Sequence, residues 1–349
     1  MRSRPSPNSP LVNPVGDRST VRKSWWSFAA VLGCLAVFFA GVARLYFRRY
    51  RLPIQAEVAL YLCLMSLVVL AVMPALAATR RLIMRWLPRP VLPALLISLT
   101  VASYLIYALA CHDFRFSALL RLLVICGLPP LAYAATPVRD HSRLWWQDAV
   151  VWTGLVLVMI FRVWNGIWNV PLRLDFMARL LFVDAAAWCW VFVRPVPRLG
   201  YSISLSSRTL RVASLNFVYF AVIAMPASMA LHFAGWDNQW RGIQDFCISY
   251  VEVLIFIAWL EELLFRGFLQ SLLSSTLKSE RLGQLTASLA FGFSHILLAP
   301  APNWRYVILA SVAGWFYGAA FRQARNLMAP CLTHALVDTA WRTWFGGRG

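Results

Sequence analysis

The chain has 349 residues, of which 60% are hydrophobic and only 13% are charged, and its mean hydropathy is +0.63. Soluble domains carry about 25% charged residues, so this composition excludes a soluble globule. The net charge is +19, yet the basic residues lie in small groups between apolar runs, as at Arg48, Arg49 and Arg51. Such groups are typical of arginines beside anionic lipid headgroups, and we expect a lipid bilayer and no nucleic acid as partner.

Residues 1–24 are rich in Pro, Ser and Arg and contain too few apolar side chains to bury a core. They predict a disordered, basic, cytoplasmic tail. The first apolar run opens with Trp25 and Trp26 and reaches about Phe47. No short apolar core with a small-residue cleavage site is present, so the run predicts a first membrane span and not a removed signal.

Ten further apolar runs follow, many of them long enough to cross a hydrocarbon core of about 30 Å. The run near 118–135 is interrupted by Pro129 and Pro130, and the run 246–273 exceeds the bilayer. We find no internal repeat. The sequence therefore predicts an all-α, polytopic membrane helix bundle of about 10–11 transmembrane helices. The runs are 57–78, 91–111, 118–135, 144–163, 176–193, 213–233, 246–273, 284–300, 305–321 and 327–345.

Positive charges predict the orientation of the last spans. Lys278 and Arg281 follow one span, and Arg322 and Arg325 follow another, whereas the connections between them carry less positive charge. The positive-inside rule places these two loops in the cytoplasm, together with the N-terminus, in what we expect to be a bacterial plasma (inner) membrane. The arginines of loop 44–51 oppose the rule, because counting back places that loop outside.

The seven cysteines fall singly, and no pair has the spacing of a CxxC motif. The pattern indicates neither a disulfide framework nor a zinc site, and we interpret the cysteines as small buried side chains.

Two adjacent acids, Glu261 and Glu262, follow the apolar stretch 253–260. A charge inside a membrane costs about 2.5–3.5 kcal/mol even on the lenient insertion scale, so two carboxylates need partners. Glu262 and Arg266 are four residues apart and share a helix face. Glu261 points about 100° away and has no local cation, which suits a general base that works near neutral pH. The alternative interpretation is an ion pair at a helix end.

Two histidines favour the catalytic interpretation. His295 lies in the apolar run 289–298, and His334 lies in the last span, four residues before Asp338. A single intramembrane histidine is usually an interhelical hydrogen-bonding residue. Burying two histidines, a glutamate pair and an aspartate separately would be costly, whereas grouped around one small wet cavity they can satisfy one another.

These residues form three motifs in a fixed order: EExxxR at Glu261–Arg266, FxxxH at Phe291–His295 and HxxxN/D at His334–Asp338. On separate membrane helices, this triple resembles the CPBP (Abi) family of intramembrane glutamic-type endopeptidases. That family includes the type II CAAX prenyl endopeptidases and bacteriocin-processing or immunity proteins. The resemblance covers about residues 245–345. We therefore expect a CPBP-type peptidase domain at 201–349, preceded by transmembrane helices of unknown role at 25–200.

The resemblance implies a role for each residue. Glu261 would be the base and, with His295, would polarise the attacking water, while His334 and position 338 would stabilise the oxyanion. Many members have Asn at that last position, and ionised Asp338 cannot donate a hydrogen bond. We therefore expect Asp338 to accept a hydrogen bond from a ring nitrogen of His334 and orient it. Glu262, Arg266 and Phe291 would support these groups without touching the reacting atoms.

No cofactor is expected. The family is usually described as metal-free, although an older interpretation took these glutamate and histidine residues as zinc ligands. The HExxH pattern of the zincins is absent here. The GxSG and GxGD motifs of other intramembrane proteases are absent as well.

The leading functional hypothesis is an endopeptidase that cuts a membrane-associated peptide or protein near the membrane interface. The second hypothesis is a non-proteolytic scaffold or immunity protein of the same fold. Such a protein would not need the three buried titratable groups Glu261, His295 and His334. A proton-coupled transporter is the third, but transporters usually have pseudo-symmetric halves. Prenylated tails, bacteriocin leaders and C-terminal sorting anchors all remain compatible substrates.

Overall fold

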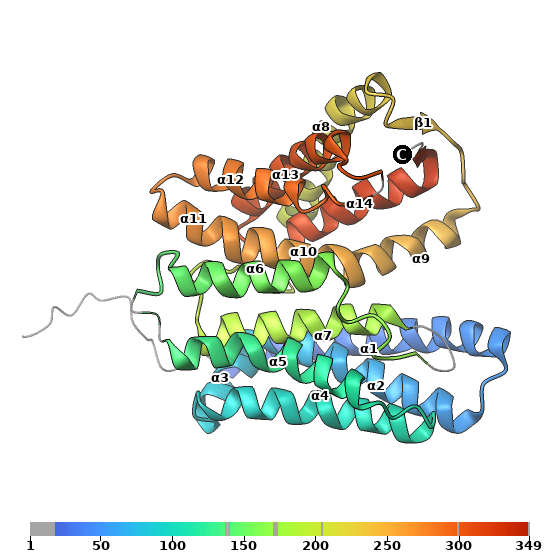
Figure 1. The fold of residues 1–349 in the computed structure, drawn as a ribbon, viewed down its shortest axis with the longest axis vertical. Helices are drawn as coiled ribbons and strands as arrows, with labels where there is room; N and C mark the ends of the chain where they lie inside the picture. Colours follow the sequence, from blue (N-terminus) through green and yellow to red (C-terminus); the bar gives the residue numbers. More distant parts are fainter. Residues whose placement is uncertain are drawn as a thin grey trace, which may run out of the picture.

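A computed structural model describes residues 18–136, 138, 140–169, 174–203, 205–298 and 300–347. Most of the helices run side by side, roughly parallel to one another (Figure 1). The predicted all-α bundle is confirmed. Of the predicted N-terminal tail, residues 1–17 lie outside the described residues, and residues 18–24 belong to the first helix.

The N-terminal half is helical throughout its described length. A 3₁₀ turn, η1 (Met73–Ala75), follows the second helix, and a π-helical turn, η2 (Cys189–Val193), follows the seventh. The helices are α1 (Arg18–Tyr50), α2 (Ile54–Val72), α3 (Ala77–Trp86), α4 (Val91–Ala110), α5 (Phe116–Ala135), α6 (Trp146–Ile160) and α7 (Asp175–Trp188).

The C-terminal half begins with α8 and contains one long helical run from Ile243 to Thr276. That run is interrupted twice by π-helical segments, η3 (Leu254–Ala258) and η4 (Leu263–Gln270). Two three-residue strands, β1 (Ala234–Trp236) and β2 (Phe345–Gly347), pair antiparallel. The helices are α8 (Ser207–Ala230), α9 (Ile243–Val253), α10 (Trp259–Glu262), α11 (Ser271–Thr276), α12 (Glu280–Phe293), α13 (Trp304–Ala324) and α14 (Met328–Trp344).

Capping side chains fix where the last helices begin. The Ser279 hydroxyl accepts a hydrogen bond from the backbone of Leu282 at the start of α12, and the Asn303 side chain accepts from Tyr306 at the start of α13. Each bond satisfies a backbone N–H that the helix leaves unpaired. Helix α13 ends at Ala324, and the next residue, Arg325, has a left-handed backbone conformation (φ 58°). The cap at Asn303 and the turn at Arg325 mark where the chain reverses direction between α12 and α13 and between α13 and α14.

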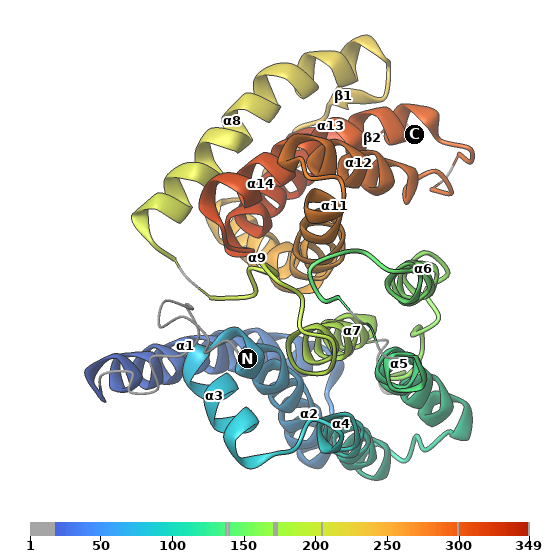
Figure 2. The ribbon, with the colours of Figure 1, turned by 90° about the vertical axis from the view of Figure 1, so that its left-hand side faces the viewer.

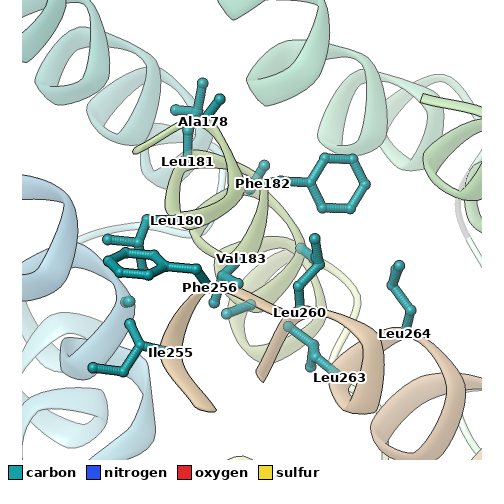
Figure 3. Packing of buried hydrophobic residues seen from close by; sticks show 14 of the residues in the cluster. Ala178, Leu180, Leu181, Phe182, Val183, Ile255, Phe256, Leu260, Leu263 and Leu264 are labelled. Atoms are coloured by element: carbon teal, nitrogen blue, oxygen red, sulfur yellow. The ribbon is translucent and has the colours of Figure 1, made fainter. Parts of the chain in front are cut away.

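The two halves share one hydrophobic core. Figure 2 shows α8–α14 on one side and α1–α5 on the other, with α7 at the boundary. Val183 of α7 lies beside Phe256 and Leu260 of the long helical run (Figure 3), and Val183 and Leu260 are at most 2% exposed. Helix α7 therefore connects the N-terminal helices to the segment that carries the glutamate pair.

Helix α6 is held by a buried ion pair. Arg194 donates to both carboxylate oxygens of Asp148 at 2.8 Å, and Tyr133 donates to the same carboxylate at 2.9 Å. Arg194 and Asp148 are almost completely buried, so each charge needs the other. The pair fixes α6 against α5 and the end of α7.

Five helical segments among the described residues are long and apolar enough to cross a membrane: Ile54–Ala75, Val91–Ala110, Phe116–Ala135, Asp175–Val193 and Ser207–Ala230. Ala29–Arg44 and Trp146–Ile160 are shorter apolar segments. The chain is thus an integral membrane protein. Helices α12 and α14 have 14 and 17 residues, shorter than the 20 or so that a full span needs.

Two elements differ from the sequence prediction. Helix α3 was not predicted, because Arg80, Arg81 and Arg85 interrupt its hydropathy. Helix α12 ends at Phe293, so His295 lies in the turn after it and not within a span 284–300. The Ser294 hydroxyl donates back to the carbonyl of Phe291 at 2.7 Å, a bond that competes with helix continuation.

Candidate active site

A cavity of about 520 Å³ opens where α6 and α12 end and α13 begins. Glu261, His295, His334 and Asp338 all line it, although they come from three separate elements. The structure therefore brings together the four side chains that the sequence motifs placed in the reacting set.

Glu261 and Glu262 lie on the short helix α10, between the π-helical segments η3 and η4. π-Helical turns are rare and often occur at functional sites, because the extra residue changes which side chains share a face. Here the two neighbouring carboxylates have different environments: Glu262 is completely buried, whereas the Glu261 side chain is 17% exposed and faces the cavity.

Glu262 connects two basic groups below the cavity. Its Oε1 atom accepts a hydrogen bond from Arg266 at 3.1 Å and lies 2.7 Å from Nδ1 of His334. Arg266 also donates to the carbonyl of Gly314 at 3.1 Å, and its guanidinium lies 4.4 Å from the ring centroid of Phe291. The predicted pair of Glu262 and Arg266 is present, and the contact of Glu262 with His334 was not predicted.

His334 is held in one orientation. Because a carboxylate oxygen only accepts, Nδ1 of His334 carries the proton that it donates to Glu262, and Nε2 points toward the cavity. The imidazole stacks on Tyr317 with ring centroids 4.6 Å apart. Nε2 lies 3.6 Å from Asp338 Oδ2 and 3.9 Å from Glu261 Oε2. At 3.6 Å the Asp338 contact is an ion-pair distance and not a hydrogen bond. The hydrogen bond that holds the ring is therefore the one from Nδ1 to Glu262, and the role expected for Asp338 stays a prediction.

His295 is also fixed through Nδ1. This atom lies 2.8 Å from the carbonyl oxygen of Phe291 and 3.1 Å from the Ser294 hydroxyl. A carbonyl only accepts, so Nδ1 carries the hydrogen and Nε2 is the ring's free acceptor when the imidazole is neutral. Phe291 and Tyr306 lie on either side of the ring, with centroids 4.8 and 4.9 Å away. Both histidines thus keep Nε2 available to the cavity.

Among the described residues, no group of three or more His, Cys, Asp or Glu side chains has an arrangement that could hold a metal ion. The expectation of a metal-free site stays a prediction, which a chelator experiment can test.

Sequence reasoning missed several polar side chains that also line the cavity, three of them arginines. Among them, Arg162 lies in the turn after α6, Arg179 in α7, Tyr306 in α13 and Arg342 in α14. The sequence contains a feature that could have indicated two of these residues. Arg342 continues the four-residue spacing of His334 and Asp338 along one helix face, and Arg179 is a charge one turn inside an apolar run.

One family model matches the chain. Residues 243–340 match the model described as type II CAAX prenyl endopeptidase Rce1-like, and this segment carries all three motifs. The match confirms the family resemblance that the motifs indicated. No curated protein and no solved structure gives a match.

Proposed function

We propose that this protein is an intramembrane endopeptidase that hydrolyses a peptide bond near the membrane interface through a water activated by Glu261 and His295. The observation that carries the proposal is the shared cavity: Glu261 and the Nε2 sides of His295 and His334 face the same space, although they lie on three different elements. The match to type II CAAX prenyl endopeptidases over residues 243–340 supports the same reaction class.

Glu261 is the general base of this mechanism. Its ionised carboxylate removes a proton from a water molecule, while Nε2 of His295 accepts a hydrogen bond from the same water and orients it. The water oxygen then bonds to the carbonyl carbon of the substrate, and the carbonyl oxygen becomes an oxyanion. Glu262 is unsuited to this role, because Arg266 and His334 occupy one of its oxygens and no part of it lines the cavity.

His334 stabilises the oxyanion. It lies among Glu262, Asp338 and Glu261, and opposite charges favour the imidazolium form, in which Nε2 carries a hydrogen. This N–H donates to the oxyanion in a cavity where water is restricted, which makes the interaction stronger than in bulk solvent. When the intermediate collapses, the C–N bond breaks and the proton held by Glu261 moves to the leaving amine.

The remaining assignments follow from this mechanism. Arg266 and Phe291 hold Glu262 and the two histidines in place, and no metal takes part in any step. The substrate is a membrane-associated peptide or protein. The peptidase domain is residues 201–349, preceded by the N-terminal helices of 25–200, and the N-terminus lies in the cytoplasm of a bacterium.

Comparative peptidomics would test the proposal. Membranes from cells that make the wild-type protein are compared with membranes from cells that make Glu261→Ala or the control Glu280→Ala. Glu280 lies at the opposite end of the bundle in exposed ion pairs with Arg198 and Arg325, which contribute little to stability.

We expect peptides that are produced by the wild-type protein and by Glu280→Ala and are missing with Glu261→Ala. The proposal would be abandoned if correctly inserted Glu261→Ala protein gave the same peptides as the wild type.

A further inference from the structure

Three arginines line the cavity beside the proposed catalytic residues. Arg162 lies in the turn after α6, Arg179 lies in α7, and Arg342 lies near the end of α14. None of them falls within the matched segment 243–340 or within the three motifs. They are therefore a feature of this chain that the family match does not explain.

Among the described residues, the side chains of these arginines have no carboxylate at ion-pair distance. In the part of the chain that the structure describes, no ion pair or side-chain hydrogen bond joins Arg162, Arg179 or Arg342 to another residue, whereas Arg266 and Arg194 have both. Glu261 and Glu252 lie close enough to attract Arg179, and Arg162 and Arg342 lie close enough to repel it. Arg342 is likewise near enough to Asp338 to attract it.

One member of this cluster is costly where it lies, while Arg162 and Arg342 are exposed. Arg179 is half-buried one turn inside an apolar span, where a charge without a partner is unfavourable. Proteins that retain such charges usually use them to bind a ligand or to move an ion. Since all three arginines line the cavity, an anion bound in it would relieve the repulsion of Arg179 by the other two.

The rest of the cavity wall indicates what carries the anion. Trp164, Phe256, Leu260, Leu309 and Trp341 line it together with the arginines, so the ligand combines an acidic group with apolar groups. The proposed substrate is a peptide, and the acidic group of an unmodified peptide is a carboxylate, which matches the planar fork of a guanidinium. Arg179 lies close enough to Glu261 to be attracted by it, so an acidic group bound at Arg179 belongs to a molecule that reaches Glu261, as the substrate does.

We propose that Arg162, Arg179 and Arg342 form a subsite that binds a carboxylate of the peptide substrate and so determines which peptide bond lies against Glu261. The inference rests on the proposed peptidase function. The carboxylate comes from the C-terminus of the peptide or from an Asp or Glu side chain. In either case the N-terminal helices, through α6 and α7, supply part of the substrate specificity.

A binding experiment tests this subsite without requiring turnover. Full-length Glu261→Gln protein in detergent is titrated with N-acetyl-trileucine, with its C-terminal amide, and with the N-acetyl-Leu-Asp-Leu amide, and affinity is read from thermal stabilisation. The same titrations are repeated after adding Arg179→Gln or Arg342→Gln, and with Arg281→Gln as the control. Arg281 is exposed at the opposite end of the bundle and does not line the cavity.

We expect the probe with the correctly placed carboxylate to bind about 10- to 100-fold more tightly than the neutral amide, the usual strength of a charge-assisted hydrogen bond. Tight binding of the free acid identifies the C-terminus as the source, and tight binding of the aspartyl amide identifies a side chain. Arg179→Gln and Arg342→Gln should remove most of this preference, while Arg281→Gln should keep it. Arg342 is exposed, so its substitution serves as the second variant if Arg179→Gln fails to fold.

Two results would overturn the subsite. One is equal affinity for all three probes, which would leave the Glu261-dependent peptidase reaction untouched. The other is a preference that survives both arginine substitutions, while the same substitutions abolish a difference in stability between phosphatidylglycerol and phosphatidylcholine nanodiscs. The arginines would then bind lipid and not substrate.

Discussion

Glu261 and Glu262 are neighbours in the chain, yet their carboxylates lie on different sides of one helix. Helical spacing predicts this separation from the sequence, because adjacent residues differ by about 100° and only Glu262 shares a face with Arg266. The contact between Glu262 and His334 could not be predicted in the same way. It depends on how α14 lies against α10, and 72 residues separate the two side chains.

The two glutamates should respond differently to the same substitution. Glu261→Gln keeps the shape of the side chain but removes the base, so the rate of cleavage should fall by about 10² to 10⁴ with little change in thermal stability. Glu262→Gln leaves the buried Arg266 charge without its carboxylate, and should lower the free energy of unfolding by about 3–5 kcal/mol. Single-turnover cleavage and thermal unfolding of both purified variants would be compared. If Glu262→Gln were well folded but inactive while Glu261→Gln remained active, Glu262 and not Glu261 would be the general base.

Asp338 should tolerate the loss of its charge. Its Oδ2 atom lies 3.6 Å from Nε2 of His334, a contact worth about 1 kcal/mol or less, and Glu262 already orients the ring. Asp338→Asn should therefore change the cleavage rate by less than about tenfold. Steady-state kinetics would check this, with His334→Ala as the comparison. His334→Ala removes an oxyanion donor, so it should lower the cleavage rate by about 10² to 10³. An Asp338→Asn protein as impaired as His334→Ala would show that the aspartate acts directly on the substrate.

Chelators should leave the reaction intact. The proposed steps need only an ionised Glu261, a water and two histidines, and the Nδ1 atoms of both histidines are already used by protein acceptors. Purified protein would be treated with millimolar EDTA or 1,10-phenanthroline and assayed for cleavage, with bound zinc measured by elemental analysis. Stoichiometric zinc whose removal abolishes cleavage and whose return restores it would contradict the prediction.

At the scale of the helices, most boundaries could be predicted and a few could not. Long apolar runs located α4, α5 and α7 to within a few residues, because hydropathy is the main signal in a membrane protein. The end of α12 was missed, since the run of apolar residues continues past Phe293 while the backbone leaves the helix. That difference affects the site, because His295 is held by a turn and not by a helix.

Close packing of α12 on α13 holds that turn in place. A Cβ atom added to Gly292 would lie 2.5 Å from the backbone oxygen of Val307 and would also contact the Ser311 hydroxyl. The backbone atom cannot move aside as a side chain can, so only glycine permits this approach.

Gly292→Ala should therefore push the two helices apart. We expect an overpacking cost of about 1–3 kcal/mol in the free energy of unfolding, together with slower cleavage because His295 moves. Gly154→Ala is the matched control, since nothing lies within 4 Å of the added Cβ and alanine favours the helix by about 0.5–1 kcal/mol. Thermal unfolding of the two variants would measure the difference. Equal stability would mean that α12 and α13 can separate at Gly292 at little cost in free energy.

At the scale of the whole molecule, the sequence divided the chain into N-terminal helices of unknown role and a peptidase domain at 201–349. Both parts contribute to one hydrophobic core, in which Phe182 of α7 and Phe256 of the long helical run belong to the same cluster. The cavity is shared as well, because Arg179 lines it together with Glu261. Sequence patterns could not reveal this sharing, since each half has the composition of an independent bundle.

The peptidase domain should therefore depend on the helices that precede it. A chain containing only residues 201–349 would expose Leu260, Leu263 and Leu264, which are at most 2% exposed in the full protein, and would lack the part of the cavity wall that carries Arg162 and Arg179. In lipid the exposed leucines cost little, because the bilayer is as apolar as the core, so the fragment should insert. The lost packing around α10 should nevertheless leave Glu261 poorly positioned and cleavage strongly reduced.

Co-expression of residues 1–200 with residues 201–349 as two chains should restore much of the activity, because the contacts between the halves do not require a continuous backbone. Cleavage by the fragment, by the split pair and by the full protein would be compared in isolated membranes at matched amounts of protein. Chemical cross-linking between cysteines placed in α7 and α10 would report whether the split halves associate. If the fragment 201–349 alone cleaved as fast as the full protein, the N-terminal helices would have no part in the site, and the arginine subsite would lose two of its three members.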